Sequence, residues 1–409
     1  MTVFYTIGIW LYSLGVRIVA LFGNAKAIQW VEGRRRQIAE PQKQQSEDWI
    51  WFHAASLGEF EQGRPVIEAL KRDFPQYKIL LSFFSPSGYE IRKDYPLADE
   101  VLYLPSDTPA HAAQWVRRHR FVAAFFIKYE FWFNYMRALK EAGIPLFYIS
   151  LILKPDSYFF RWYGTWFLRQ LSNVTHFFVQ DDTTAQLLQS KGMTNVTVCG
   201  DTRFDRVAAI AQQAKSFPEV EQFIAGRRCI IAGSTWPPDE KLLLEFYPQL
   251  PDDYCLIIAP HDISASHVEQ IRTQFPQAVL YTELKEGSRT NLMVVNTIGI
   301  LSQLYQYARF VYIGGGFGVN IHNIQEPVTF GCPVVFGPKY KSFKEAVDLV
   351  SLEGAFSVRD AAEMTAIFTC LMTDEEYYAK ASETCHNYLD SQVGATESIL
   401  TGFKKALFS

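Results

Sequence analysis

The feature that most restricts the fold of this chain is a rhythm of short apolar runs that alternate with segments of helical length. From about Trp51 the runs are WIWFHAAS, YKILLSFFS, EVLYLP, RFVAAFFIKY, IPLFYISLI and THFFVQD, and each is bounded by turn residues. Runs of strand length with helices between them predict βαβ units and a parallel sheet.

The rhythm breaks between Phe204 and Arg228, then starts again with RRCIIAGS, YCLIIAPH, AVLYTE, LMVVNT, FVYIGGG and CPVVFGP. One sheet does not comfortably hold all of these strands, so we expect two doubly wound α/β domains with ligands bound in a cleft between them. A polar linker is expected at 39–48. The predicted parts are an amino-terminal segment (1–36), a first domain (37–205), a linker (206–228), a second domain (229–375) and carboxy-terminal helices (376–409).

Composition narrows the class of protein. The 409 residues are 48% hydrophobic, which supplies enough apolar side chains for two cores. The net charge of −4 disfavours nucleic acid as a partner, because proteins that bind nucleic acid usually carry a basic excess. The six cysteines form no CxxC pair, so the sequence predicts buried free thiols and no zinc site.

The first 22 residues form an apolar segment in which Arg17 is the only charge, and a basic cluster follows at 34–36. A signal peptide would carry its positive charge first, so we expect this segment to be retained and the arginines to stay in the cytoplasm. A full span needs about 20 apolar residues, so the segment is borderline. A membrane-crossing anchor, an interfacial helix and a buried helix of the first domain all remain open.

Two motifs in the first half place carboxylates directly after predicted strands. In HAASLGE, Ser56 can cap the following helix, Gly58 allows a ligand to approach the backbone, and Glu59 lies in the first helical turn. In KYEFWFN, Glu130 follows the apolar strand FVAAFFI. Either carboxylate could act on a ligand as a general base or a hydrogen-bond acceptor, or could simply complement a helix dipole.

Two motifs in the second half suit an anionic ligand. Three glycines, Gly314, Gly315 and Gly316, end a strand and allow a phosphate or ribose to come close, and HNIQEP follows with Asn323 and Glu326. FGPKYKSFKE then supplies cations, although a solvated basic loop is the usual meaning of such a run. The pattern is not GxGxxG and has no Walker lysine, which disfavours NAD and ATP.

Taken together, these motifs are similar to those of the 3-deoxy-D-manno-octulosonic acid (Kdo) transferases of lipopolysaccharide biosynthesis, over nearly the whole chain. The matching stretches are the apolar amino terminus, HAASLGE, FSPSGYE, YLPSDTP, YEFWFN, VCGDTRFD, AGSTWPPDE, NTIGILSQLY, YIGGGFG, HNIQEP and FGPKYKSFKEA. The resemblance implies an α/β GT-B fold, with two Rossmann-like domains facing across a cleft, plus an amino-terminal membrane-anchor helix.

The chain departs from the family pattern at several places. Lys128 replaces the first acidic residue of ExELWPN, and Phe133 replaces its proline. The arginine of the family's Pro-Arg-His is absent before His261, and another is absent from the stretch 150–154. Arg203 replaces a lysine and keeps its charge. These changes affect the expected donor contacts and leave the number of sugars added open.

The resemblance also implies roles for individual residues. Glu59 would remove the proton from the acceptor hydroxyl in an inverting transfer, and Glu130 would orient the sugar or acceptor. CMP-Kdo is the implied donor and a lipid A precursor (lipid IVA) the acceptor, with no cofactor, no metal and no nucleic acid. The implied donor-binding residues are Ser234, Thr235, His261, Gly314, Gly315, Gly316, Asn323, Glu326 and Lys341, and the implied acceptor-binding residues are Ser56, Gly58, Arg64 and Lys128.

The implied location is the bacterial inner membrane, with the catalytic domains on the cytoplasmic side. Two other classes stay open on the sequence alone. One is a GT-B transferase that uses a UDP-sugar for another glycolipid, because the fold predicts it equally well. The other is a non-catalytic, membrane-associated nucleotide-binding relative.

Overall fold

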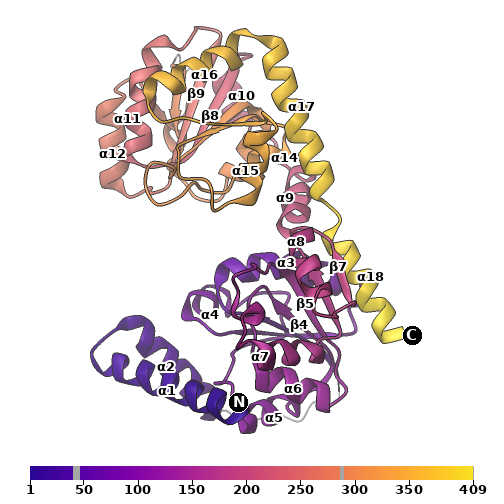
Figure 1. Cartoon of the computed structure of the whole chain (residues 1–409). Helices are drawn as coiled ribbons and strands as arrows, with labels where there is room; N and C mark the ends of the chain where they lie inside the picture. Colours follow the sequence, from indigo (N-terminus) through magenta and orange to yellow (C-terminus); the bar gives the residue numbers. More distant parts are fainter. Residues whose placement is uncertain (40–46, 286–289, 409) are drawn as a thin grey trace. The chain divides into compact units, whose positions relative to one another are not determined.

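The computed structural model describes residues 1–39, 47–285 and 290–408, which form two compact α/β units (Figure 1). The first comprises residues 1–205 and 392–409, and the second comprises residues 206–391. Each unit contains a parallel sheet flanked by helices, so the predicted pair of Rossmann-like domains is confirmed. The polar linker predicted at 39–48 lies mostly outside the described residues.

The first sheet has seven parallel strands in the order β3-β2-β1-β4-β5-β6-β7. Their bounds are β1 (Asp48–Ala54), β2 (Lys78–Phe83), β3 (Glu100–Tyr103), β4 (Arg120–Ile127), β5 (Leu146–Leu151), β6 (His176–Val179) and β7 (Val196–Val198). Strand β1 pairs with β2 on one side and β4 on the other, so the direction of winding reverses between β1 and β4. In such sheets the crevice at the carboxyl ends of the two central strands is the usual ligand site.

Helices cover both faces of this sheet: α3 (Leu57–Asp73), α4 (Pro86–Arg92), α5 (Pro109–Val116), α6 (Phe133–Glu141), α7 (Thr165–Gln170), α8 (Asp182–Gln189) and α18 (Ala395–Phe408). Alternation along β1 sends Trp51 into one core and Phe52 into the other. The last helix belongs to this unit because the Asp205 carboxylate accepts hydrogen bonds from the Gly394 and Thr396 N–H groups, at 2.6 and 2.7 Å.

The second sheet has the order β10-β11-β9-β8-β12-β13-β14, and its direction of winding reverses between β8 and β12. Its strands are β8 (Arg228–Thr235), β9 (Tyr254–Pro260), β10 (Val279–Leu280), β11 (Leu292–Val294), β12 (Ala308–Ile313), β13 (Val334–Phe336) and β14 (Ala355–Ser357). Its helices are α11 (Pro237–Phe246), α12 (Ala265–Gln274), α13 (Leu301–Leu304), α14 (Gln325–Thr329), α15 (Lys344–Ser351) and α16 (Ala361–Thr373).

Two segments predicted to lie between or beyond the domains are helical. The stretch predicted as a linker at 206–228 contains most of α9 (Thr202–Gln212) and all of α10 (Pro218–Ile224). The carboxy-terminal stretch forms two helices, as its sequence indicates: α17 (Glu375–Gln392) and α18. Helix α17 belongs to the second unit except for its last residue, and α18 belongs to the first.

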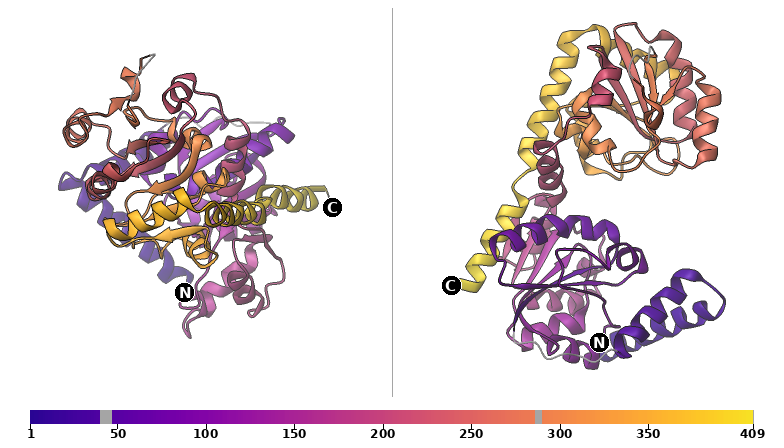
Figure 2. Two further views of the ribbon diagram at one scale, coloured as in Figure 1. Left: turned by 90° about the horizontal axis from the view of Figure 1, so that it is seen from above. Right: turned by 180° about the vertical axis from the view of Figure 1, so that it is seen from behind.

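The amino terminus forms a hairpin of α1 (Thr2–Leu21) and α2 (Ala25–Ala39), which lie side by side and extend from the first unit (Figures 1 and 2). The first turn of α1 is attached to the first unit by the Tyr5 hydroxyl, which donates to the Asp107 carboxylate at 2.6 Å. Helix α1 is long and apolar enough to cross a membrane by length and composition, and none of its residues is fully buried.

Candidate functional site

Both candidate carboxylates of the first unit lie at its topological switch point. Strand β1 runs into the turn before α3, which carries Glu59, and the neighbouring strand β4 runs into the turn that carries Glu130. The carboxyl ends of parallel neighbours meet at one edge of the sheet, so the fold brings the two side chains together. The negative charge of Glu130 contributes to a raised pKa of Glu59.

The start of α3 differs from the prediction in one respect. Ser56 occupies the N-cap position in an extended conformation, but its side chain makes no capping hydrogen bond. The carboxylate of Glu59 instead reaches back and accepts a hydrogen bond from the Ala55 N–H at 2.5 Å. The predicted capping hydrogen bond of Ser56 is therefore absent, and the Glu59 side chain instead accepts from an N–H group that precedes the helix.

Burial tunes the acidity of Glu59. Desolvation is the largest effect, and together with the negative charge of Glu130 it raises the pKa of Glu59 to about 7. The backbone N–H groups of Ala55 and Ser56 and the ammonium of Lys128 act in the opposite direction. A carboxylate with a pKa near neutrality suits general-base catalysis, because it is partly ionised and still basic enough to take a proton.

Glu130 belongs to a buried polar cluster with His53 and Trp132. Its Oε2 accepts a hydrogen bond from the Trp132 indole at 2.7 Å and lies 3.1 Å from Nε2 of His53. The other ring nitrogen of His53, Nδ1, contacts the hydroxyl of Ser82 at 2.8 Å. The Tyr148 hydroxyl donates to the backbone carbonyl of Glu130 at 2.7 Å. Glu130 is therefore held by contacts from several elements of the first unit.

The predicted acceptor-binding residues occupy different environments. Gly58 is exposed at the start of α3, and a Cβ atom there would meet nothing within 4 Å, so this face of the turn is open. Lys128 adopts a left-handed backbone conformation (φ 58°) directly after β4, which for a residue with a side chain is a local strain typical of functional turns. Arg64 lies farther along α3 and pairs with Glu68 at 2.7 Å.

The glycine turn of the second unit is built around a buried carboxylate that the sequence analysis did not single out. Oδ2 of Asp239, on α11, accepts hydrogen bonds from the N–H groups of Gly315 and Trp236, both at 2.9 Å. Its Oδ1 accepts from the Tyr312 hydroxyl at 2.7 Å. Burial raises the pKa of Asp239, and these donors oppose that shift. One side chain thus ties together the turns that follow β8 and β12.

Glycine is required in this turn for steric reasons. A Cβ atom on Gly314 would lie 2.3 Å from the carbonyl oxygen of Ser234, and one on Gly316 would lie 2.7 Å from the backbone of Gly337. Gly315 has a left-handed conformation (φ 91°), which residues with side chains rarely adopt. Ser234 has a positive φ of 53° at the end of β8. The two central strands of the second unit therefore end in close-packed, strained backbone.

Three rings form a stacked platform beside this turn. The rings of Trp236 and His261 are 4.7 Å apart, and those of His261 and His322 are 4.4 Å apart. The Trp236 indole donates to Nε2 of His322 at 2.9 Å. Burial and the neighbouring His261 lower the pKa of His322, which favours its neutral form. Trp236 and His261 are exposed, so the platform is accessible to a planar or sugar-like ligand.

The remaining predicted donor residues lie in three different environments. Asn323 and Glu326 contact each other, with Nδ2 of Asn323 donating to Oε1 of Glu326 at 3.2 Å. Burial raises the pKa of Glu326. Lys341 is exposed after β13. Thr235 is fully buried, and its hydroxyl donates to Glu240 at 3.1 Å, so the side chain is engaged inside the fold.

Sequence reasoning missed His53, Trp132 and Asp239 as members of these sites. The signals were present, because the first two stand inside the quoted motifs and Asp239 is an acidic residue in the first turn of a helix. What the sequence could not show is that His53 and Trp132 contact Glu130 and that Asp239 binds the glycine turn. Among the described residues, no group of three or more His, Cys, Asp or Glu side chains is arranged to hold a metal ion.

Comparisons with known proteins bear on the first unit most directly. Residues 31–206 match the family model described as 3-Deoxy-D-manno-octulosonic-acid transferase (kdotransferase). A 3-deoxy-D-manno-octulosonic acid transferase of Aquifex aeolicus is 27% identical over 335 residues, which cover 79% of this chain and 86% of that protein. One from Bordetella pertussis is 24% identical over 374 residues, covering 86% of each. The resemblance drawn from the sequence motifs is confirmed.

Solved structures show the same fold at low sequence identity. The UDP-GlcNAc 2-epimerase of Neisseria meningitidis, bound to UDP-GlcNAc, superposes with a TM-score of 0.62 at 15% identity and covers 88% of this chain and 100% of that one. A putative UDP-N-acetylglucosamine 2-epimerase from Listeria monocytogenes gives 0.57 at 13% identity, with 88% and 97% covered. These likenesses establish two Rossmann-like domains of the GT-B type and nothing about the substrate.

Proposed function

We infer that this chain, a glycosyltransferase that resembles the Kdo transferases along most of its length, moves Kdo from CMP-Kdo to a hydroxyl of a lipid A precursor. Kdo transfer is supported by the family match and by the curated relatives. The donor, the acceptor and the stereochemistry are our proposal. The observation that carries the mechanism is the carboxylate of Glu59, held at a switch point with a pKa near 7.

Glu59 acts as the general base. Its Oε2 accepts from the Ala55 N–H, and the carboxylate takes the proton from the acceptor hydroxyl. The hydroxyl oxygen forms a bond to the anomeric carbon of Kdo while the bond from that carbon to the phosphate oxygen of CMP breaks. CMP departs with the bonding electrons, and the configuration at the anomeric carbon inverts. Removing such a base typically costs about 10²–10⁴ in rate.

Glu130 has a different role, which we assign to orientation. It is fixed by the Trp132 indole and lies beside His53, so it is a rigid hydrogen-bonding group next to Glu59. Its negative charge also helps to keep the proton affinity of Glu59 high. We propose that it holds a hydroxyl of the sugar or acceptor, and that Ser56, Gly58, Arg64 and Lys128 contribute contacts to the acceptor.

The second unit holds the donor. We propose that the nucleotide approaches the backbone of the glycine turn and that Asn323 with Glu326 offers hydrogen bonds to ribose hydroxyls. The stacked rings Trp236 and His261 provide a surface for the base or sugar. Ser234 and Lys341 are proposed near the phosphate, whereas the buried hydroxyl of Thr235 supports the turn from within. Backbone dipoles and cations then stabilise the departing phosphate.

The amino-terminal hairpin favours an interfacial helix over a membrane-crossing one. Helix α1 lies against α2, which carries Lys26, Glu32 and three arginines, and burying α1 in hydrocarbon would take those charges with it. The outward face of α1 is apolar at helical spacing, with exposed Val3, Phe4, Ile7, Trp10, Leu11, Leu14, Ile18 and Leu21. We propose that this face rests in the cytoplasmic surface of the bacterial inner membrane, where the lipid acceptor resides.

The central test is Glu59→Gln, with Glu68→Gln on the same helix as the matched control. Transfer from CMP-Kdo to a tetraacylated lipid A precursor is followed by the mass of the lipid product, in EDTA, and CMP binding is followed by calorimetry. We expect Glu59→Gln to lower kcat by at least about 10²-fold with CMP affinity unchanged. The control, whose carboxylate accepts from the Arg64 guanidinium at 2.7 Å, should keep the native kcat.

Other outcomes identify which part of the proposal fails. Loss of CMP binding in Glu59→Gln would contradict the assignment of this residue to acceptor chemistry. Product formed by the native protein with a UDP-sugar instead of CMP-Kdo would replace the donor but keep the site. Nucleotide binding without any transfer, beside an active control enzyme, would identify a non-catalytic relative.

A further inference from the structure

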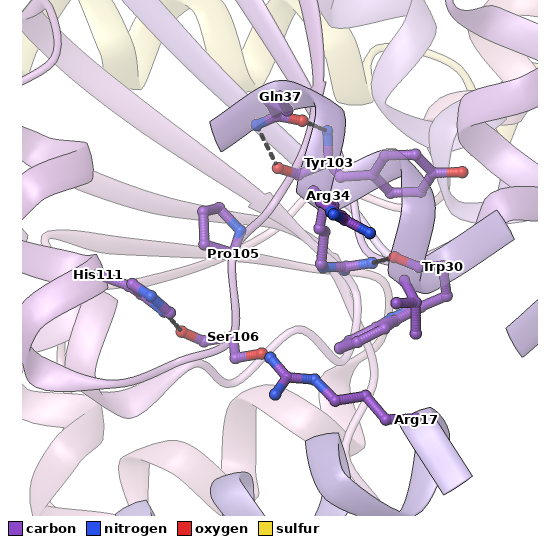
Figure 3. A pocket seen from close by; sticks show the side chains of 10 residues that line it. Arg17, Trp30, Arg34, Gln37, Tyr103, Pro105, Ser106 and His111 are labelled. Carbon is purple, nitrogen blue, oxygen red and sulfur yellow. Dashed lines mark hydrogen bonds between the residues drawn. The ribbon is translucent and has the colours of Figure 1, made fainter. Parts of the chain in front are cut away.

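A pocket of about 280 Å³ opens where the α1–α2 hairpin meets the segment that follows β3 (Figure 3). None of its side chains takes part in the proposed transfer. Its lining includes Arg17 from α1, Trp30, Arg34 and Arg35 from α2, Tyr103 from the end of β3 and His111 from α5. It therefore joins three separate stretches of chain around one cavity in the first unit.

The lining carries three guanidinium groups and no carboxylate. Arg34 is buried and donates to the backbone carbonyl oxygens of Trp30, Phe84 and Leu104. These three acceptors are neutral, so they do not cancel its positive charge. Arg17 and Arg35 are exposed, and neither forms an ion pair within residues 1–39, 47–285 and 290–408. A cavity with this charge distribution attracts an anion, and guanidinium groups match the oxygens of a phosphate.

The aromatic part of the lining fixes the cavity in place. The Arg34 guanidinium lies 3.9 Å from the centre of the Trp30 ring and 5.0 Å from that of Tyr103. The Tyr103 backbone exchanges two hydrogen bonds with the Gln37 side chain, at 2.8 and 2.7 Å. His111 is held through Nδ1 by the Ser106 carbonyl oxygen at 2.9 Å. These contacts give the cavity a rigid floor.

The position of Arg17 indicates where the anion comes from. At 100° per residue, Arg17 falls at the edge of the apolar face formed by Trp10, Leu14 and Ile18, on the side that turns toward the cavity. A helix that lies in a membrane surface keeps that boundary at the depth of the lipid headgroups. Figure 3 shows Arg17 extending from its helix toward the cavity.

We propose that this pocket binds the phosphate of an anionic bilayer phospholipid, distinct from the acceptor of the transfer reaction. Arg17 and Arg35 contact the phosphate oxygens, Arg34 supplies a fixed positive charge beneath them, and the acyl chains lie along the apolar face of α1. This inference depends on the membrane contact of the hairpin proposed above and is independent of which sugar is transferred.

The test compares two variants of the full chain. The double variant Arg17→Gln/Arg35→Gln removes the two free cations of the pocket. The control Arg36→Gln removes one cation from the same hairpin that does not line the pocket and that pairs with Glu32 at 3.0 Å. Binding is measured by flotation with vesicles of phosphatidylcholine alone and with vesicles that also contain phosphatidylglycerol. Matching thermal unfolding curves establish that both variants are folded.

We expect the double variant to lose about tenfold or more of its affinity for the anionic vesicles and none of its affinity for the neutral ones. The control should stay within about twofold of the native protein for both. An equal loss in the control would show diffuse electrostatic attraction and overturn the pocket. An unchanged double variant would overturn it as well.

Two further arms distinguish the source of the phosphate. Inorganic phosphate, compared with chloride at equal ionic strength, should not displace the native protein from anionic vesicles, and displacement would show that the pocket takes free phosphate. In neutral detergent the double variant should keep the native KM for the lipid acceptor. A raised KM with native vesicle binding would assign the pocket to the acceptor. If the native protein transfers no Kdo, the proposed function fails while the vesicle results still decide this proposal.

Discussion

The two units place their candidate sites at the same topological position and equip them with opposite chemistry. In the first, the turns after β1 and β4 carry Glu59 and Glu130, and the negative charge of Glu130 raises the pKa of Glu59. In the second, β8 and β12 end in a glycine turn fastened by a buried Asp239. Winding order determines where a ligand can bind, and the few residues after the central strands determine what is done to it.

The difference also concerns rigidity. The glycine turn of the second unit is closely packed at Gly314, because a Cβ there would overlap the backbone. The first unit leaves the start of α3 open, because a Cβ on Gly58 would meet nothing within 4 Å. A closely packed turn suits a nucleotide of fixed shape, whereas an open one suits a large lipid-linked acceptor.

The largest effect that we predict tests this difference directly, by comparing Gly314→Ala with Gly58→Ala. In Gly314→Ala the new Cβ atom would lie 2.3 Å from the Ser234 carbonyl oxygen, so the backbone must shift. We expect this substitution to destabilise the second unit by about 3 kcal/mol and to abolish CMP binding. Gly58→Ala should change the free energy of unfolding by less than about 0.5 kcal/mol. Urea unfolding and calorimetry measure both. Equal destabilisation by the two substitutions would remove the proposed difference between the turns.

The second prediction concerns the pH dependence created by Glu59. Its pKa is about 7 in the fold and 4.5 for the ordinary carboxyl, so the folded protein holds this proton more tightly than the unfolded chain. The resulting stabilisation is complete below about pH 4.5 and is lost as the pH rises through 7. Glu59→Gln should therefore be more stable than the native protein by about 2 kcal/mol at pH 8, and equal to it near pH 4.

Activity should follow the opposite course, because the base must be ionised to accept a proton. We expect kcat/KM of the native enzyme to rise with pH and to level off above about pH 7, the pKa of Glu59. Thermal unfolding of the native protein and of Glu59→Gln measures the predicted stability difference at each pH. The pH profile of kcat/KM measures the predicted activity. A rate profile that levels off near pH 4.5 would show that Glu59 is not the titrating base.

A third prediction compares the two indoles, one in each site. Trp132→Phe removes the N–H that binds Glu130 and keeps the ring that lies 4.7 Å from Phe84, and should lower kcat about tenfold with CMP affinity unchanged. Trp236→Phe removes the N–H that binds His322 and should weaken CMP binding by a similar factor. Steady-state kinetics and calorimetry distinguish them. Exchange of the two phenotypes would overturn the division of labour.

The sequence was sufficient for the architecture and for placing the two carboxylates and the glycine turn after the central strands, because strand rhythm and motif position follow from local pattern. It was not sufficient for the contacts. Ser56 has the right residue type and position for a cap, yet its side chain makes no capping hydrogen bond. Thr235 has a hydroxyl in the right motif, yet the strand directs it inward to Glu240. Side-chain direction depends on neighbours distant in sequence, which a single motif does not encode.

The smallest effect concerns Arg64, whose residue type alone suggested a contact with the acceptor. Its guanidinium pairs with Glu68 on a half-buried face of α3, and pairs four residues apart on a helix contribute about 0.3–0.5 kcal/mol to stability. Arg64→Gln should therefore leave unfolding nearly unchanged. If the guanidinium leaves Glu68 for an acceptor phosphate, the KM for the lipid should rise severalfold at constant kcat, and dephosphorylated acceptor should show no such rise. An unchanged KM for both acceptors would show that Arg64 does not contact the acceptor. The proposed acceptor contacts would then be limited to the open turn around Gly58.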